Sequence, residues 1–295
     1  MTTGSSLSVH RRLERGASEL RSTSVEGSRF EAELLLRHAL GWSRESLLAR
    51  LHEPVSAEAA GHYFQLVERR RGRVPIQHIL GNQEFFGLSF RVTPAVLIPR
   101  PETEGVVEEA LRELGGGSGT AVALRIADVG CGSGCIAIAL ARELSETHIV
   151  AIDISPAALA VARENAIRHE VDGRVELVLG DLLAPLLERG SRVDAVVSNP
   201  PYVVDAEIES LAPEVSEHEP RTALAGGGDD GLSIVSRLLV QANEALKQGG
   251  LLFMEIGRGQ DRRVAELTSD SSLELLRIVP DLAGIPRVVV ARKSG

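Results

Sequence analysis

The chain has 295 residues, of which 43% are hydrophobic and 25% are charged, and its formal net charge is −9. This length allows about two domains with packed cores, and the composition is that of an ordinary globular protein. The excess of acidic residues lies after residue 95, so that part of the chain repels a phosphate backbone, and direct binding of a long nucleic acid is not expected.

We expect neither a leader sequence nor a membrane span. The first twenty residues lack the apolar stretch of a secretory signal, and the longest apolar runs, such as 135–141, are too short to cross a bilayer. We therefore expect a cytoplasmic protein with no membrane partner. The two cysteines, Cys131 and Cys135, match neither the ligand spacing of a zinc site nor a redox pair, so no metal is expected.

Residues 1–74 are predicted to form a small bundle of helices, because apolar residues recur at the three- and four-residue spacing of a helix face. These apolar positions are Leu7, Leu13, Leu20, Phe30, Leu34, Leu35, Ala39, Tyr63, Phe64 and Val67. Gly16, Gly27, Gly41, Gly61 and Pro54 are predicted to divide the region into three or four helices.

Residues 75–95 are predicted to form a β-hairpin that links the bundle to the rest of the chain, because two short alternating runs flank Gly87. A helix is then expected from Pro101 to about Leu114. Proline is tolerated in a first helical turn, where Glu102 and Glu104 also complement the helix dipole. The glycine-rich stretch 115–119 is predicted to be a flexible connector.

From Arg125 onward, predicted strands and helices alternate. The strands are expected at 125–129, 148–152, 174–179, 193–198, 250–255, 273–279 and 287–291, and the helices at 133–144, 156–169, 232–247 and 259–268. This alternation predicts an α/β fold with a doubly wound, mainly parallel sheet and right-handed crossovers.

The turn after the first of these strands has the character of a cofactor site. Residues 128–134 read Asp-Val-Gly-Cys-Gly-Ser-Gly, and glycines on a strand-to-helix turn let a ligand approach the backbone. The spacing is GxGxG, because Cys135 stands where a dinucleotide-binding fingerprint has its third glycine. Asp153 ends the second strand, where a carboxylate can accept both hydroxyls of a ribose, and Asp181 follows the third strand, placed to meet a base amine.

The stretch Asn199-Pro200-Pro201-Tyr202 follows the fourth strand, at the sheet edge where ligands bind in open α/β folds. Two consecutive prolines remove two backbone donors and hold the chain extended. The Asn199 side-chain oxygen and the Pro200 carbonyl can each accept one hydrogen of a planar NH2 group, while the Tyr202 ring can stack on that group. The stretch therefore favours recognition of an amide or an exocyclic amine.

These four features, in this order, resemble the class I S-adenosylmethionine-dependent methyltransferases, and the tetrapeptide resembles their amino-methylating branch. Longer motifs resemble the release-factor glutamine methyltransferase family (HemK/PrmC). They are PIQHILG at 75–81, EFFGL at 84–88, IPRPETE at 98–104, NPPY at 199–202, EP at 219–220 and DLAGIPR at 281–287. Two positions depart from the family pattern: the loop at 224–232 is one residue longer, and His78 stands where tyrosine is usual.

The resemblance implies a Rossmann-like catalytic domain over residues 96–295 whose last strand is antiparallel, and an N-terminal domain that engages a protein substrate. It implies S-adenosylmethionine as cofactor. The residues implied to bind it are Gly130, Cys131, Gly132, Ser133 and Gly134 at the methionine end, Asp153 at the ribose, Asp181 and Leu182 at the adenine, and Asn199. The residues implied to bind the substrate are Asn199, Pro200, Pro201 and Tyr202, of which Asn199, Pro200 and Tyr202 are implied to be catalytic.

The resemblance implies methylation of the side-chain amide nitrogen of the glutamine in the Gly-Gly-Gln motif of peptide-chain release factors. The alternatives are a ribosomal-protein glutamine methyltransferase, an N6-adenine nucleic-acid methyltransferase, and a non-catalytic binding module with the same fold. Residues 221–224, which follow Glu219 and Pro220, favour release factors, and the acidic charge of the catalytic half argues against nucleic acid.

Overall fold

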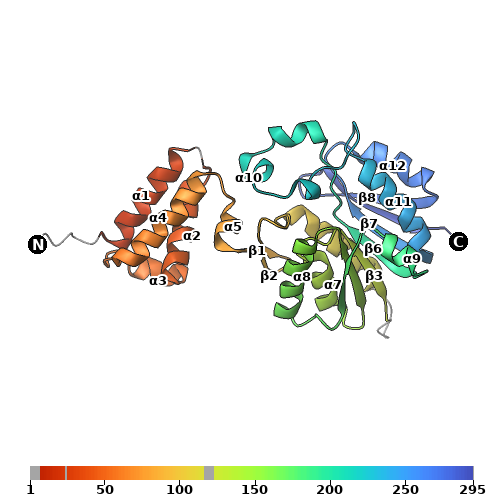
Figure 1. Ribbon diagram of the computed structural model, residues 1–295, viewed down its shortest axis with the longest axis horizontal. Coiled ribbons are helices and arrows are strands. Elements are labelled where there is room, and N and C mark those ends of the chain that lie inside the picture. Colours follow the sequence, from red (N-terminus) through yellow and green to blue (C-terminus); the bar gives the residue numbers. More distant parts are fainter. Residues whose placement is uncertain (1–6, 24, 116–122, 295) are drawn as a thin grey trace, which may run out of the picture. The chain divides into compact units, whose positions relative to one another are not determined.

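Figure 1 shows the computed structural model of the chain, which describes residues 7–23, 25–115 and 123–294. Most of the predicted connector, residues 116–119, lies outside the described residues. The chain forms two compact units. The helical unit contains the residues up to Gly81 together with Pro213–His218, and the sheet unit contains Asn82–Ala212 and the residues from Glu219 onward.

The helical unit begins with four helices, where the apolar spacing predicts three or four. They are α1 (Val9–Arg21), α2 (Ser28–Leu40), α3 (Arg44–Ala49) and α4 (Ala57–Arg71), followed by α5 (Ile76–Leu80) and, from later in the chain, α10 (Pro213–Ser216). Ser8, Ser43 and Ser56 precede α1, α3 and α4, and the oxygen of each side chain accepts a backbone N–H of the first turn.

Two of the predicted helix breaks are wrong. Gly16 lies inside α1 and Gly61 lies inside α4. Gly16 is required by packing, because a Cβ at this position would collide with the hydroxyl of the buried Tyr63 ring. The predicted span of the hairpin is also wrong at its start, because Ile76–Leu80 form a helix that ends at Gly81 with a left-handed φ of +76°.

The segment Pro213–His218 is joined to the helical unit by buried charges. The Arg70 guanidinium is nearly buried, and it donates to Glu31 Oε2 at 2.5 Å and to Glu214 Oε1 at 2.8 Å. Arg73 Nη2 donates to the other oxygen of Glu214 at 2.7 Å. A charge this deeply buried must be paired, so these contacts tie the segment to the end of α4.

The hairpin of the sheet unit consists of β1 (Asn82–Phe85) and β2 (Leu88–Arg91). Its two-residue turn has positive φ at Phe86 and Gly87, the combination that matches strand twist in a tight hairpin. Phenylalanine is strained in this conformation, and its backbone N–H is held by Glu104 Oε1 at 2.7 Å. Phe85 and Phe90 are buried and meet edge to face.

The main sheet has seven strands in the order β5-β4-β3-β6-β7-β9-β8. They are β3 (Arg125–Val129), β4 (His148–Asp153), β5 (Val175–Leu179), β6 (Val193–Ser198), β7 (Leu246–Glu255), β8 (Leu273–Pro280) and β9 (Pro286–Lys293). Strands β3 to β7 pair in parallel, whereas β9 is antiparallel to both β7 and β8. The predicted α/β fold with an antiparallel last strand is therefore confirmed.

Helices cover both faces of this sheet, as the predicted double winding requires. One core contains side chains of α6 (Glu104–Leu114), α7 (Cys135–Glu143) and α8 (Pro156–Arg168), and the other contains side chains of α9 (Ala184–Glu188), α11 (Ser233–Ala245) and α12 (Asp261–Asp270). Successive strand residues alternate between the two cores: Ile126 packs in the first and Ala127 in the second.

Short elements that the periodicity does not predict connect these strands and helices. They are α9 and the 3-10 turns η2 (Asp205–Ser210) and η3 (Arg221–Ala223). The helix predicted from Pro101 begins as a 3-10 turn, η1 (Pro101–Thr103), and continues as α6. Within the described part of the chain, no helix combines the length and the apolar character that a membrane crossing needs.

Candidate active site

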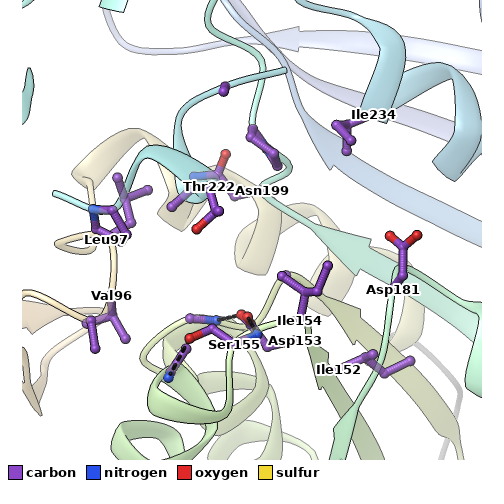
Figure 2. Close-up of a pocket in the computed structure, with 18 of the residues that line it drawn as sticks. Val96, Leu97, Ile152, Asp153, Ile154, Ser155, Asp181, Asn199, Thr222 and Ile234 are labelled. Atoms are coloured by element: carbon purple, nitrogen blue, oxygen red, sulfur yellow. Dashed lines mark hydrogen bonds between the residues drawn. The ribbon is translucent and has the colours of Figure 1, made fainter. Parts of the chain in front are cut away.

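The sheet unit has a cavity of about 440 Å³ at the carboxyl ends of β3, β4, β5 and β6. Its lining includes six of the predicted cofactor residues, namely Gly130, Gly132, Asp153, Asp181, Leu182 and Asn199, and also Pro201 of the tetrapeptide. Figure 2 shows Asp153 and Asp181 on one side of the cavity, with Asn199 and Thr222 across from Asp153. The carboxyl ends of neighbouring parallel strands bring these residues together.

The glycine turn leaves room for a ligand against its backbone. Gly130 and Gly132 have left-handed φ values of +71° and +54°, and a Cβ at either position would extend into open space. Gly134, with φ of +80°, instead packs closely against Ala162 of α8 and does not line the cavity. The first two glycines thus form a cradle that side chains would fill, and the third lets the start of α7 pack closely against α8.

Asp153 is held rigidly at the end of β4. Its Oδ2 accepts the Gly132 N–H at 2.8 Å, and its Oδ1 accepts the Ser155 N–H at 2.9 Å. Each carboxylate oxygen has a further lone pair, because an ionised carboxylate offers about four acceptor positions. The side chain can therefore accept additional hydroxyl groups without giving up its backbone partners.

Asp181 lies further along the same side of the cavity, beyond the end of β5, and its side chain is about half exposed. Its Oδ2 pairs with Arg237 of α11. The next residue, Leu182, also lines the cavity and has a left-handed φ of +52°. The pair with Arg237 orients one carboxylate oxygen and leaves the other for a hydrogen-bond donor in the cavity.

Two polar side chains beneath the glycine turn have unused hydrogen-bonding capacity. Asp128 is fully buried; its Oδ2 accepts the Ala137 N–H at 3.0 Å, while neither its Oδ1 nor the buried Ser133 hydroxyl has a partner among the described residues. Burial raises the pKa of Asp128 to about 7. Burial also raises the thiol pKa values of Cys131 and Cys135, which lie outside the cavity lining, so neither is a ready thiolate.

Apolar side chains complete the walls, and no motif in the sequence singles them out. Val96 and Leu97, Ile154, and Ile234 line the cavity from three different segments, and Figure 2 shows them around its interior. Ile154 is 61% exposed although it is large and apolar. An exposed apolar side chain directly after Asp153 provides a surface on which a planar base can pack.

Asn199 stands where β6 ends, and its side chain is fixed by a residue from η1. Its Nδ2 donates to Thr103 Oγ1 at 2.9 Å. Among the described residues, none hydrogen-bonds to Asn199 Oδ1 or to the carbonyl oxygen of Pro200. Of the other three members of the tetrapeptide, Pro201 lines the cavity, whereas Pro200 and Tyr202 do not.

Tyr202 is anchored at both ends. Its hydroxyl donates to Glu255 Oε1 at 2.9 Å, and its carbonyl oxygen accepts from Gln260 Nε2 at 2.9 Å. Burial and the neighbouring Glu255 carboxylate raise the pKa of the Tyr202 phenol, so the hydroxyl stays protonated. Glu255, at the end of β7, has 1% of its surface exposed, and burial raises its pKa as well.

The glycine-rich loop at 224–232 packs against the backbone of Tyr202. At Gly231, where φ is +73°, a Cβ would lie 2.5 Å from the Tyr202 carbonyl oxygen, and at Gly226 a Cβ would overlap the Gly231 carbonyl. Val203 pairs with Ala225 in a parallel bridge. The loop therefore supports the tetrapeptide at a distance that only glycine permits.

A buried ion pair fixes the wall that Pro220 and residues 221–223 contribute. Arg100 Nη2 donates to both oxygens of Glu219, at 2.7 and 2.8 Å, and the Glu219 side chain is 1% exposed. Burial raises the pKa of Glu219, while the Arg100 charge opposes that shift. The pair joins the segment before α6 to the segment after Glu219, and both segments line the cavity.

The fold of the chain is similar to that of two solved methyltransferase structures. The hMettl16 catalytic domain is 17% identical and has a TM-score of 0.55, covering 71% of this chain and 76% of that one. The 16S rRNA methyltransferase RsmC of T. thermophilus, solved with AdoMet and guanosine, is 17% identical and has a TM-score of 0.51, covering 72% of this chain and 49% of that one. The fold and the cavity define a class I methyltransferase, whose cofactor is S-adenosylmethionine.

Residues 12–81 match the model of the PrmC N-terminal domain, and residues 119–229 match the methyltransferase small domain. Release factor glutamine methyltransferases of Moorella thermoacetica and Geobacter sulfurreducens are 43% and 44% identical to the chain. The first alignment covers 97% of this chain and 98% of the relative, and the second covers 92% of each. The chain belongs to the release factor glutamine methyltransferase family.

The residues of the cavity fit this cofactor. S-adenosylmethionine carries positive charge on its sulfonium and ammonium groups, and Asp153 places a carboxylate in the cavity lining, directly beside the glycine cradle. Asp128 Oδ1, just before the turn, and the hydroxyl of Ser133, within the turn, have no hydrogen-bond partner among the described residues. The volume of about 440 Å³ is within the range of ligand pockets.

Proposed function

We propose that this protein methylates the side-chain amide nitrogen of the glutamine in the Gly-Gly-Gln motif of peptide-chain release factors. The observation that carries the proposal is the position of Asn199, which lines the cavity across from Asp153 with its Nδ2 already bonded to Thr103. The relatives named for this substrate, at up to 44% identity, support it.

In the proposed reaction, the protein acts mainly by orientation. Asn199 Oδ1 and the Pro200 carbonyl oxygen each accept one hydrogen of the substrate amide, which holds its nitrogen toward the methyl donor. When bound, S-adenosylmethionine would supply an electrophilic methyl group: its S–CH3 bond breaks as the N–CH3 bond forms, and S-adenosylhomocysteine leaves. The nitrogen then loses one proton to water. Orientation of reacting groups can lower a barrier by roughly 7 to 11 kcal/mol in the best cases. The fixed acceptors also stabilise positive charge as it develops on the nitrogen.

The cofactor residues have separate proposed roles. Asp153 accepts the ribose hydroxyls, and Asp181 with Leu182 contacts the adenine. Gly130 to Gly134 hold the methionine end, with Cys131 and Ser133 contributing backbone groups, because their side chains are buried. The Tyr202 ring stacks on the substrate amide, and its bonds to Glu255 and Gln260 restrict its movement.

We further propose that the helical unit engages the protein substrate and that the protein acts in the cytoplasm. The match of residues 12–81 to the PrmC N-terminal domain supports the first part. A free adenine base also carries an NH2 group that two acceptors can bind. The net charge of −9 disfavours a nucleic-acid substrate, so the protein amide is preferred.

The proposal is tested by incubating the purified protein with methyl-labelled S-adenosylmethionine and a purified release factor, then locating the label by peptide mass spectrometry. The label is expected on the motif glutamine. A release factor with glutamate at that position, which has the same shape but no NH2 group, is the matched control and should stay unlabelled. Label on a different residue, or on ribosomal protein or RNA offered in parallel but not on the release factor, would refute the proposal.

The Asn199→Ala variant separates catalysis from cofactor binding. Turnover is expected to fall by roughly 100-fold or more, as when one oriented polar group is removed from an active site. Calorimetric binding of S-adenosylmethionine should be largely retained. Near-normal turnover of the purified variant would remove Asn199 from the reaction.

A further inference from the structure

The end of the Asn199 carboxamide that faces the cavity decides what the site can recognise. Its oxygen accepts hydrogen bonds and its nitrogen donates them, although the two ends have almost the same shape. The side-chain partner of this amide is Thr103 Oγ1, at 2.9 Å. The orientation of the amide therefore depends on whether the Thr103 hydroxyl is a donor or an acceptor in this contact.

Glu255, the second hydrogen-bond partner of the Thr103 hydroxyl, decides whether that hydroxyl donates to Asn199 or accepts from it. Its Oγ1 lies 2.5 Å from Oε2 of Glu255, and both side chains are buried. A hydroxyl has one proton, and an ionised carboxylate can only accept. The Thr103 proton is thus used on Glu255, and Thr103 Oγ1 can only accept from Asn199. The amide must then turn its nitrogen toward Thr103 and its oxygen away.

Glu255 is in turn held by the tetrapeptide itself. Its second oxygen, Oε1, accepts the Tyr202 hydroxyl at 2.9 Å, so one carboxylate receives two hydroxyl protons. Burial, the largest influence, raises the pKa of Glu255, as does the charge of Glu102, whereas these two hydroxyl bonds and the charge of Arg287 lower it. The same carboxylate therefore directs Asn199 through Thr103 and fixes the Tyr202 ring.

We infer that Thr103 and Glu255 are positioning residues that fix the polarity of Asn199, so that its oxygen is offered to the substrate. The inference rests on the proposed function, because it explains how the site distinguishes glutamine from glutamate. A glutamine NH2 group meets an acceptor at Asn199 Oδ1. A glutamate carboxylate meets the same oxygen with no proton between them, and is rejected.

The activity test replaces Thr103 by valine, which keeps the shape and removes the hydroxyl. With release factor as substrate, kcat is expected to fall on the order of tenfold to hundredfold. The Kd for S-adenosylmethionine should stay within about twofold, because Thr103 does not line the cavity. The Thr103→Ser variant, which restores the hydroxyl, should recover most of kcat.

The matched control is Thr268→Val. Thr268 is fully buried in α12, and its hydroxyl donates to the Val264 carbonyl at 2.7 Å, away from the cavity. This variant should leave kcat unchanged. A Thr103→Val enzyme whose kcat equals that of the wild type, or that loses kcat no more than the Thr268→Val enzyme, would overturn the inference.

A second readout does not depend on the substrate. The Asn199 side-chain NH2 resonances, assigned in ¹H–¹⁵N NMR spectra by their loss in Asn199→Asp, should be protected from exchange in the wild type. They should shift and lose protection in Thr103→Val but not in Thr268→Val. Unchanged resonances in Thr103→Val would refute the orientation. Protected resonances in a protein that fails to methylate release factors would refute the proposed function alone.

Discussion

Replacing Asp153 by alanine is expected to weaken the binding of S-adenosylmethionine about 100-fold. The carboxylate is fixed in place by the Gly132 and Ser155 N–H groups, at 2.8 and 2.9 Å, and it lines the cavity. In the proposed complex it accepts two ribose hydroxyls, and a hydrogen bond to a charged group contributes about 1.5 to 3 kcal/mol. Loss of two such bonds at the lower figure costs about 3 kcal/mol, and each 1.4 kcal/mol is tenfold in Kd.

The assay is calorimetric titration of the purified protein with S-adenosylmethionine. Asp153→Asn provides a second measurement, because its NH2 end must face one of the two backbone N–H groups, donor against donor. It should therefore bind more weakly than the wild type despite its equal size. Asp172→Ala, at an exposed position outside the cavity, is the matched control. A Kd for Asp153→Ala within about threefold of the wild type would refute the assigned role.

Two further predictions concern the support of the site and its buried acid. Gly231→Ala places a Cβ 2.5 Å from the Tyr202 carbonyl oxygen, so it should lower the free energy of unfolding by roughly 1 to 3 kcal/mol and reduce turnover. Gly190 also has a left-handed backbone conformation, but a Cβ there meets open space, so Gly190→Ala should retain turnover. Equal turnover of the two variants would contradict the packing argument. Because burial raises the pKa of Asp128 to about 7, the folded state binds more protons than the unfolded state between about pH 4 and 7. The free energy of unfolding of the wild type should therefore fall relative to that of Asp128→Asn as the pH rises through this window, by about 4 kcal/mol at most. If urea unfolding gives the same difference between the two proteins at pH 5 and at pH 8, the burial argument is contradicted.

The alternation of strands and helices was predictable because buried parallel strands are short apolar runs and each run here is followed by a helical pattern. The strand 193–198 was predicted with the bounds it has in the structure. Short elements escaped prediction, because Ile76–Leu80 is too short to show a helical period. A helix break was wrongly predicted at Gly16, because the reason for a glycine there is its close packing against Tyr63, which lies 47 residues away in the chain.

The same limit applies to the site. Residues that end neighbouring strands, such as Asp153 and Asn199, could be grouped from the sequence, because parallel strands deliver their ends to one edge. Thr103 and Glu255 could not be paired in this way, since 152 residues separate them and only the packed structure brings their oxygens to 2.5 Å. Glu255 ends strand β7, and this position at a strand end is the feature from which the sequence could have indicated a site residue.

The central claim is that the oxygens of Asn199 and Pro200 accept the two hydrogens of a glutamine side chain. The most direct test is a crystal structure of the protein with S-adenosylhomocysteine and a release factor bound. We expect the glutamine Nε2 to lie within about 3 Å of both oxygens, with Asn199 Nδ2 still donating to Thr103 Oγ1. A glutamine whose carbonyl faces Asn199, or whose amide lies away from both oxygens, would contradict it.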